Sequence, residues 1–555
     1  MDLALPKESD GKSRERWAIR GLLGATLLLQ LGFFLRHVDS PVLYRDEAND
    51  VFTARSSWGD LLRHFISDWD PYVWILALKG WTAIWGTSEL AARSICWASM
   101  SCSVLLFFSV CRRWTRDPLI AASASVLLGL GTPMMMTSIG YARPYALSLL
   151  CSVWMLDRCL AFREGPTVRR YILFAVAALA FGNIQPVNYG MAAGLCVLIL
   201  WERFSAPRTS RAWWRSAALL LLILGAAASP SLLQSLRFGS VDTGLSAVDP
   251  QQLGVRFFAA LSWKWLGSVC AAVPGVITTA FDDHPAGFFQ GLRAGQGRWI
   301  GVLVAAIWMG VIWRYARRMR SAGQCQHLVL AAILVAAPLL ILGIGSLRVD
   351  RLTSPIRAYA AYGPGLCLLL VLLVRPWRIL VWALPVLTLS RMAAVLLFLQ
   401  DASIAHRSDA KAATAWMDDV RASDLVLLAN PAIGPTFHYY YRGPSTEQVL
   451  PYDGPVLYWH DMQLWRDLHD PGMEDRVSAK VLEASRKGER VWFLWGGTPL
   501  GEDPLRWHPY YAPRAFMAAR RVLDERFVKV RSADFTKTME PFHVALYEPL
   551  EGSAP

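Results

Sequence analysis

The sequence predicts a polytopic α-helical membrane protein with about eleven transmembrane helices, followed by a C-terminal soluble α/β domain. Hydrophobic residues make up 54% of the 555 residues, and the mean hydropathy is +0.31. The apolar residues form long unbroken stretches, which a soluble domain of this length would not contain. Short basic clusters separate these stretches at alternate loops, as in membrane proteins whose basic loops face the cytoplasm.

Each predicted span follows from an apolar run near the ~20 residues that a helix needs to cross the hydrocarbon core. Some runs are shorter than this ideal, so the count is approximate. The predicted spans are 18–37, 88–110, 118–136, 142–161, 171–188, 190–203, 216–234, 297–314, 327–346, 360–374 and 376–399.

Lys and Arg residues predict the orientation of these spans. The basic clusters lie at 7–20, 112–116, 163–170, 203–215, 314–320 and 375–378. They fall at alternate loops, which should face the cytoplasm, and residues 1–17 form a cytoplasmic N-terminus. No small-residue cleavage signal follows the first apolar run, so we expect an uncleaved first span in the inner (plasma) membrane. An odd number of spans places the region from 401 on the non-cytoplasmic face.

The net charge of +13 does not indicate nucleic-acid binding. The positive charges lie in loops between apolar segments, and no basic stripe alternates with aromatic residues in a soluble segment. None of the nine cysteines lies after Cys367, so the C-terminal region has no disulfide or thiolate metal site. The carboxylates and histidine of 282–284, and His438, are ordinary loop residues without a metal-binding motif, so no cofactor is required and a divalent metal stays open.

The sequence predicts three parts. Residues 18–400 form the transmembrane domain, with outer loops at 38–89 and 237–296, and residues 401–555 form the α/β domain. In that domain we expect helices at 409–421, 475–487 and 513–526, and strands at 424–429, 490–495 and 543–547. The stretch 72–86 suits an interfacial helix, although a true span is the alternative.

Acidic side chains in the first outer loop are candidates for acid–base chemistry. Asp46 and Glu47 follow the first span directly, where a carboxylate could take the proton from an acceptor hydroxyl as it attacks a sugar. A solvated loop pair is the alternative. Asp68 and Asp70 come later in the same loop, where Asp70 and the following Pro71 equally suit the start of an interfacial helix.

Two arginine segments are candidates for binding a lipid phosphate. In the first, Arg143 lies between Tyr141 and Tyr145 at the outer end of a span; snorkelling to the headgroups is the alternative. The second contains Arg351, Arg357 and Tyr359. Its position on the non-cytoplasmic side opposes the usual charge bias, and cations there suit a phosphate leaving group. Pairing with Asp350 or with anionic lipids is the alternative.

Together, in this order, the four segments resemble the GT-C superfamily of membrane glycosyltransferases, in particular the bacterial branch related to protein O-mannosyltransferases and aminoarabinose transferases. The matching segments are Asp46-Glu47, Asp70-Pro71-Tyr72, Trp85-Gly86-Thr87-Ser88-Glu89 with Arg93, Ala142-Arg143-Pro144-Tyr145, and Arg357-Ala358-Tyr359 with Pro364. The sequence departs from the family pattern at Asp70, where a histidine is usual, and at Ala358, which separates an arginine from a tyrosine.

The resemblance implies a sugar donor carried on polyprenyl phosphate and an envelope acceptor that is a glycan, a lipid or a protein. It implies direct displacement with inversion, with Asp46 as base or acceptor-orienting group. Phosphate contacts would come from Arg143, Arg351 and Arg357, and hydroxyl contacts from Glu47, Asp68 and Asp70.

Three other functions are compatible with parts of the sequence. A transporter or lipid flippase would need polar residues near mid-span or broken helices in matched halves, and the sequence has no internal symmetry. A polysaccharide polymerase or ligase would also use arginines at the outer face. A catalytically inactive scaffold would tolerate Asp46→Asn.

Overall fold

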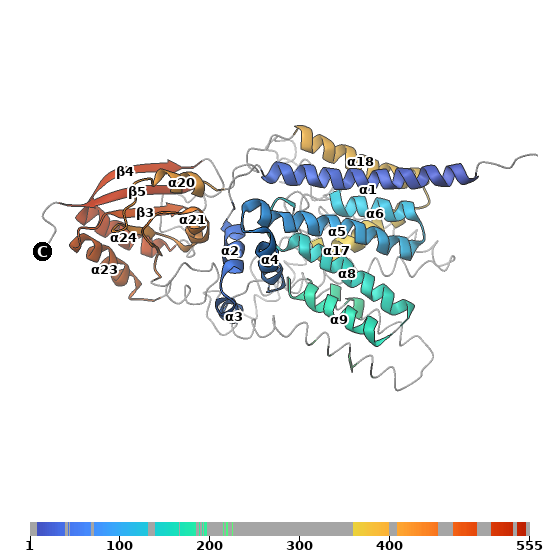
Figure 1. The fold of residues 1–555 in the computed structure, drawn as a ribbon, viewed down its shortest axis with the longest axis horizontal. Coiled ribbons are helices and arrows are strands. Elements are labelled where there is room, and N and C mark those ends of the chain that lie inside the picture. Colours follow the sequence, from blue (N-terminus) through green and yellow to red (C-terminus); the bar gives the residue numbers. More distant parts are fainter. Residues whose placement is uncertain are drawn as a thin grey trace, which may run out of the picture. The chain divides into compact units, whose positions relative to one another are not determined.

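A computed structural model describes residues 8–38, 43, 45–67, 72–130, 139–165, 167–184, 359–398, 408–452, 470–496, 512–536 and 541–550, with isolated residues between 188 and 225 (Figure 1). The chain divides into two compact units. The first unit comprises residues 1–35 and 93–399, and the second comprises residues 36–92 and 400–555. The second unit therefore extends beyond the predicted C-terminal domain, because it also includes the whole of the predicted first outer loop, residues 38–89.

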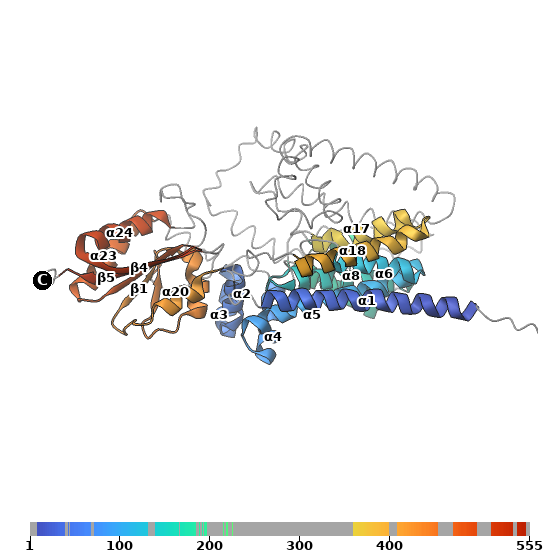
Figure 2. The same cartoon turned by 90° about the horizontal axis from the view of Figure 1, so that it is seen from above.

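The first unit is a bundle of helices (Figure 2). Its described helices are α1 (Glu8–Val38, which continues past the unit boundary), α5 (Glu89–Thr115, which begins before it), α6 (Pro118–Leu130), α8 (Tyr145–Glu164), α9 (Val168–Gly182), α17 (Tyr359–Val374) and α18 (Arg378–Phe398).

Three of the described helices are long and apolar enough to cross a membrane, and they match the predicted spans at 18–37, 88–110 and 142–161. Their membrane-crossing segments are Ser13–Arg36, Glu89–Thr115 and Tyr145–Phe162. Two shorter apolar helices, Pro118–Leu130 and Ala360–Val374, lie in the predicted spans 118–136 and 360–374. The predicted spans at 297–314 and 327–346 and most of 190–203 and 216–234 lie outside the described residues.

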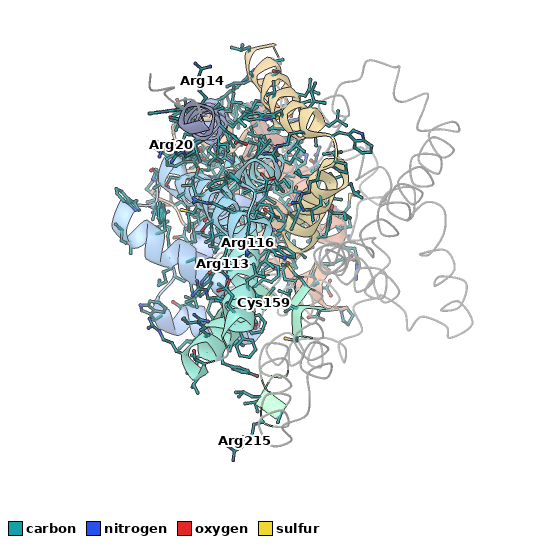
Figure 3. The ribbon with its side chains drawn as sticks, turned by 90° about the vertical axis from the view of Figure 1, so that its right-hand side faces the viewer. Arg14, Arg20, Arg113, Arg116, Cys159 and Arg215 are labelled. Carbon is teal, nitrogen blue, oxygen red and sulfur yellow. The ribbon has the colours of Figure 1, made fainter. Side chains whose placement is uncertain are left out.

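Basic residues gather at one end of this bundle, which we call the basic end (Figure 3). Arg113, near the last turn of α5, pairs with Asp157 at 2.9 Å and with Glu164 at 3.0 Å, both on α8. Arg378, the first residue of α18, pairs with Glu15 of α1 at 3.1 Å and with Asp117, just before α6, at 2.5 Å. Because these contacts join ends of helices, α1, α6 and α18 start at the basic end, whereas α5 and α8 finish there.

Small and polar residues allow the helices of the bundle to approach closely. The amide of Gln30 on α1, which is fully buried, donates to the carbonyl of Gly129 on α6 at 3.3 Å and accepts from the hydroxyl of Ser101 on α5 at 3.1 Å. A Cβ atom at position 129 would lie 2.5 Å from Val104, so only glycine fits there. Close backbone approach and shared hydrogen bonds are typical of helices packed in a membrane.

The second unit begins with three helices from the first outer loop. These are α2 (Arg45–Arg55), α3 (Trp58–Ser67) and α4 (Tyr72–Trp85). Helix α4 has 14 residues, fewer than the ~20 that a span needs, so the stretch 72–86 does not form a full-length span in the structure.

The rest of the second unit is a five-stranded sheet with the strand order β2-β1-β3-β5-β4. Strands β1 (Leu425–Leu428), β2 (Glu447–Val449) and β3 (Val491–Gly496) are parallel, and β5 (Phe542–Pro549) lies antiparallel to β3 and to β4 (Phe527–Phe535). Its helices are α20 (Ala410–Trp416), α21 (Gly434–Tyr440), α23 (Met473–Arg486) and α24 (Pro513–Arg526), with a short 3₁₀ turn, η4 (Pro431–Ile433).

Helices cover both faces of this sheet. Neighbouring residues of a strand point to opposite faces. On β3, Trp492 contacts Trp416 of α20, with ring centroids 6.0 Å apart, whereas Phe493 stacks on Phe516 of α24 at 5.6 Å. Each of the six predicted elements in this region has a matching helix or strand, whereas β2, β4 and α21 were not predicted.

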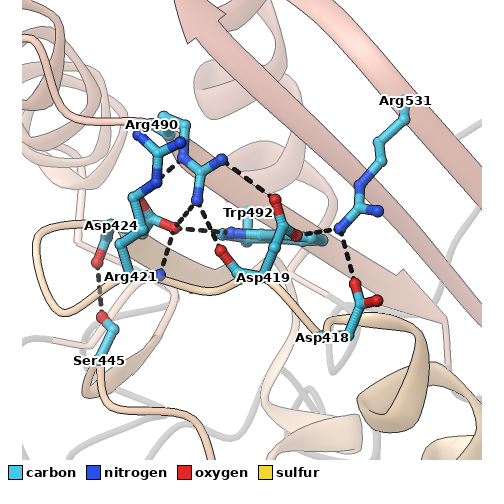
Figure 4. Close-up of polar contacts among 8 residues, drawn as sticks. All are labelled: Asp418, Asp419, Arg421, Asp424, Ser445, Arg490, Trp492 and Arg531. Atoms are coloured by element: carbon cyan, nitrogen blue, oxygen red, sulfur yellow. Dashed lines mark hydrogen bonds and ion pairs between the residues drawn. The ribbon is translucent and has the colours of Figure 1, made fainter.

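A buried ion pair closes the edge of the sheet where the parallel strands begin (Figure 4). Asp424 precedes β1 and accepts hydrogen bonds from the guanidinium of Arg490, at 3.0 and 2.7 Å, and from the indole N–H of Trp492, at 3.0 Å. Burial alone would raise the pKa of Asp424, but these bonds and the Arg421 backbone N–H outweigh burial and hold the pKa below its usual value.

We expect Asp424→Asn to destabilise the sheet domain by about 2 kcal/mol, because Arg490 would lose its buried carboxylate. The folded-state pKa of Asp424 is lowered, so its stabilising contribution is complete at neutral pH and is lost as the pH falls through that pKa. The difference in melting temperature between wild type and variant should therefore shrink below about pH 4. Tryptophan-fluorescence melts of the full chain across pH would measure it, and a constant difference would contradict the assignment.

Candidate functional site

The acidic pair predicted from the sequence lies in the first turn of α2. Carboxylates are favourable there because the N-terminus of a helix carries partial positive charge. Helix α2 turns a polar face inward: Glu47 and Asp50 are fully buried, and Asn49 is 3% exposed. Asp46 lies in the same helix, but its side chain is outside the described residues.

Helix α4 supplies the partners that hold α2. The indole N–H of Trp74 donates to the carboxylate of Asp50 at 2.7 Å, and both side chains are fully buried. The ammonium of Lys79 donates to the carbonyls of Ala54, at 3.1 Å, and Ser56, at 2.6 Å, which lie at the C-terminal end of α2. A cation at these carbonyls completes the last turn of a helix. The lysine that interrupts the apolar stretch 72–86 therefore stabilises the acidic helix.

The first arginine segment forms a turn just before α8, and α5 holds its backbone. The thiol of Cys96 lies 3.3 Å from the carbonyl oxygen of Tyr141 and 3.6 Å from that of Arg143. The backbone N–H of Arg143 donates to the carbonyl of Tyr141 at 2.7 Å. The side chains of Tyr141, Arg143 and Tyr145 are half-buried. Because α8 finishes at the basic end, this turn lies at the opposite end of the bundle.

The second arginine segment immediately precedes α17. Arg351 and Arg357 lie outside the described residues, and Tyr359 is the first residue of α17, with its side chain also outside them. Helix α17 packs against α8 and is followed after three residues by Arg378 at the basic end. It therefore starts at the same end of the bundle as the Arg143 turn. Asp68 and Asp70 also lie outside the described residues.

Arg93 had no predicted role of its own in the site. It lies on α5, one helical turn before Cys96, and is only 1% exposed. A buried arginine in an apolar helix is costly and usually serves a function. The signal in the sequence was an arginine one turn into a predicted span, next to the resembling segment 85–89.

Within the described ranges, no group of three or more His, Cys, Asp or Glu side chains is arranged to hold a metal ion. His438, the weak metal candidate, pairs instead with Glu447 of β2.

These apolar helices, with their shared basic end, define a helical membrane protein. No family model and no curated protein matches the sequence. Among solved structures, the chain is similar to ArnT from Cupriavidus metallidurans bound to undecaprenyl phosphate, at 13% identity and a TM-score of 0.45, covering 96% of this chain and 99% of ArnT. For ArnT in the apo state the values are 12% and 0.41, covering 97% and 99%.

A third similar structure is the arabinofuranosyltransferase AftD from Mycobacteria, at 13% identity and a TM-score of 0.43. The match covers 96% of this chain but 40% of AftD. Because all three TM-scores are below 0.5, no residue of this chain takes a role from these three structures.

We expect Trp74→Phe to destabilise the packing of α2 on α4 by about 1–2 kcal/mol, because the buried Asp50 carboxylate would lose its indole donor. Trp85→Phe, at a largely exposed position on the same helix, is the matched control and should change little. Thermal unfolding of the detergent-solubilised chain would compare the two. Equal melting temperatures for both variants would show that the indole bond contributes nothing.

Proposed function

We propose that this chain transfers a sugar from a polyprenyl-phosphate donor to an envelope acceptor at the non-cytoplasmic face of the membrane. In this proposal the basic end of the bundle faces the cytoplasm, as the bias of Lys and Arg favours. The acceptor is a glycolipid, a polysaccharide or a protein.

One observation carries the proposal: the helices of the first unit run so that α1 ends, and α8 and α17 begin, at the pole opposite the basic end. Helix α1 starts at the basic end, so it finishes at the opposite pole, and Arg45 of α2 follows Val38 after six residues. The Arg143 turn and the start of α17 also belong to that pole. Carboxylates in the segment that follows α1, and guanidinium groups in the segments that precede α8 and α17, suit a reaction in which a proton leaves a hydroxyl while a phosphate leaves a sugar.

In the proposed reaction, Asp46 accepts the proton of the acceptor hydroxyl as its oxygen attacks the anomeric carbon of the sugar. The bond between that carbon and the phosphate oxygen breaks, polyprenyl phosphate leaves with the electron pair, and the anomeric configuration inverts. Because Glu47 is fully buried, we assign it to holding α2 and leave the proton transfer to Asp46.

Guanidinium groups would stabilise the negative charge that grows on the leaving phosphate. An arginine fork binds two phosphate oxygens at once, which a lysine does not. We assign this role to Arg143, Arg351 and Arg357, and add Arg93 because its buried charge lies within a helical turn of the residue that contacts the Arg143 turn.

The distribution of charge favours this function over a transporter. Ion and substrate pathways through a membrane place ionisable residues near mid-span. Among the described residues of the first unit, the buried charged side chains are Arg93 and Asp157, each within roughly two turns of a helix end. A polysaccharide polymerase or ligase remains the second candidate, since arginines at the outer pole would serve that chemistry as well.

Asp46→Asn should reduce sugar transfer by roughly 100-fold or more, because the amide cannot accept the proton. The measurement is release of radiolabelled sugar from polyprenyl phosphate by purified protein with envelope extract. Asp60→Asn is the matched control, since Asp60 accepts a hydrogen bond from the hydroxyl of Ser57 at the exposed start of α3, and this variant should transfer normally. Wild-type turnover by a well-inserted Asp46→Asn protein would remove the assignment of the base.

Arg143→Ala should weaken binding of polyprenyl phosphate by roughly 10- to 100-fold, as expected for the loss of a charged hydrogen-bonding partner. Arg143→Lys should recover only part of the affinity, because it keeps the charge and loses the fork. Arg112→Ala, an exposed position at the basic end, is the control. Titration of each purified variant with the lipid phosphate would measure the effect, and equal affinity in all three variants would refute the role of Arg143.

A further inference from the structure

The sheet domain reaches the acidic helix through α21. This helix and α2 pack against each other within the second unit. The hydroxyl of Tyr440, the last residue of α21, accepts a hydrogen bond from the backbone N–H of Leu43 at 2.6 Å. The same hydroxyl donates to the carboxylate of Glu89, the first residue of α5, at 3.2 Å. One side chain therefore joins the segments that lead into α2 and α5.

Two neighbouring residues of α21 reinforce this connection. The hydroxyl of Tyr439 donates to the carbonyl of Thr87 at 2.6 Å, and the guanidinium of Arg55 lies over the Tyr439 ring, 5.7 Å from its centroid. The ring of Phe52, also on α2, meets His438 edge-on with centroids 4.9 Å apart. Two rings thus contact the last turn of α2, and a hydroxyl contacts the backbone two residues before this helix begins.

Contacts within the sheet domain fix the position of α21. Phe437 is fully buried in the domain core and stacks on Tyr441, with centroids 4.9 Å apart. The imidazole of His438 pairs with Glu447 of β2. The side chain of Asn430 accepts from the backbone N–H of Ile433 at 3.3 Å and donates to the carbonyl of Gly496 at 2.6 Å, which ties the start of this segment to β3.

The hydroxyl of Tyr440 binds the backbone a few residues before the proposed base, Asp46. Leu43 is fully buried and precedes Asp46 by three residues, so a bond to its backbone N–H restrains the entry to the first turn of α2. Glu89 and Thr87 belong to the segment 85–89 that resembles a family motif. The sheet domain therefore contacts both ends of the first outer loop, on either side of its acidic residues.

We propose that Tyr440 is a positioning residue through which the C-terminal sheet domain fixes the acidic first turn of α2. This inference rests on the proposed sugar transfer for its catalytic consequence, but not for its structural content. It assigns the sheet domain a part in the proposed reaction without requiring this domain to bind the acceptor. Tyr440 itself touches no reacting atom in this proposal.

Tyr440→Phe tests the inference because it keeps the ring and removes only the hydroxyl. Tyr441→Phe is the matched control: it is the adjacent tyrosine, and its ring packs within the sheet domain. Hydrogen exchange of the full chain in detergent, followed in peptides covering residues 43–50, should quicken roughly fivefold in Tyr440→Phe, as for the loss of one hydrogen bond. It should be unchanged in Tyr441→Phe.

Turnover supplies a second readout that separates positioning from general loss of structure. In Tyr440→Phe, kcat for transfer from the polyprenyl-phosphate donor should fall roughly fivefold, with KM for the donor and the melting temperature unchanged. Glu89→Ala should not add its full effect to that of Tyr440→Phe, because both remove the same link.

Exchange and kcat that do not differ between Tyr440→Phe and Tyr441→Phe would overturn the inference, as would fully additive effects with Glu89→Ala. If the wild-type protein transfers no sugar from any polyprenyl-phosphate donor, the proposed function fails. The exchange of residues 43–50 would then still decide whether Tyr440 restrains α2.

Discussion

The second unit is organised by the need to bury carboxylates on the acidic helix α2. A buried carboxylate is tolerated only where donors satisfy its oxygens. The indole of Trp74 does this for Asp50, and the ammonium of Lys79 completes the carbonyl end of the same helix. The packing of α4 follows from these contacts, and α21 of the sheet domain covers the side of α2 that carries Phe52 and Arg55. These contacts restrain the position of α2, as the proton transfer that we propose for Asp46 would require.

In the first unit, most of the described charged side chains lie near the ends of helices. Arg113 and Arg378 find their carboxylates at the basic end, where water and headgroups reduce the cost of burial. Mid-bundle contacts use neutral groups instead, such as the amide of Gln30 against the backbone of Gly129. Of the buried charged side chains described in this unit, Asp157 lies near the basic end and Arg93 lies near the opposite end of α5. This separation leaves the pole opposite the basic end for the arginine segment to which we assign phosphate binding.

Apolar periodicity and turn signals predicted most of the elements in the described part of the chain. Helices α5, α8 and α24 and strands β1 and β3 agree with their predicted ranges to within a few residues. Strand β2 has only three residues, too few for an alternating pattern to be recognised. Strand β4 lies at an edge of the sheet and is mostly exposed, so its sequence lacks the apolar signal of a core strand. Helix α21 is short and aromatic. Its local sequence does not predict that Tyr440 bonds to Leu43 and Glu89, which lie some 350 to 400 residues earlier.

The sequence by itself determined what depends on composition and on nearby residues: the apolar spans, the basic end, the alternation of the C-terminal elements, and the chemical types of the candidate side chains. These follow from hydrophobicity and propensity, which act over a few turns of chain. Only the tertiary structure decided that Trp74 and Asp50 share one buried contact, that Cys96 lies against the Arg143 turn, and that residues 36–92 form one unit with the sheet domain. Such contacts join distant residues through packing, and the energy that selects them exists only once the whole unit has assembled.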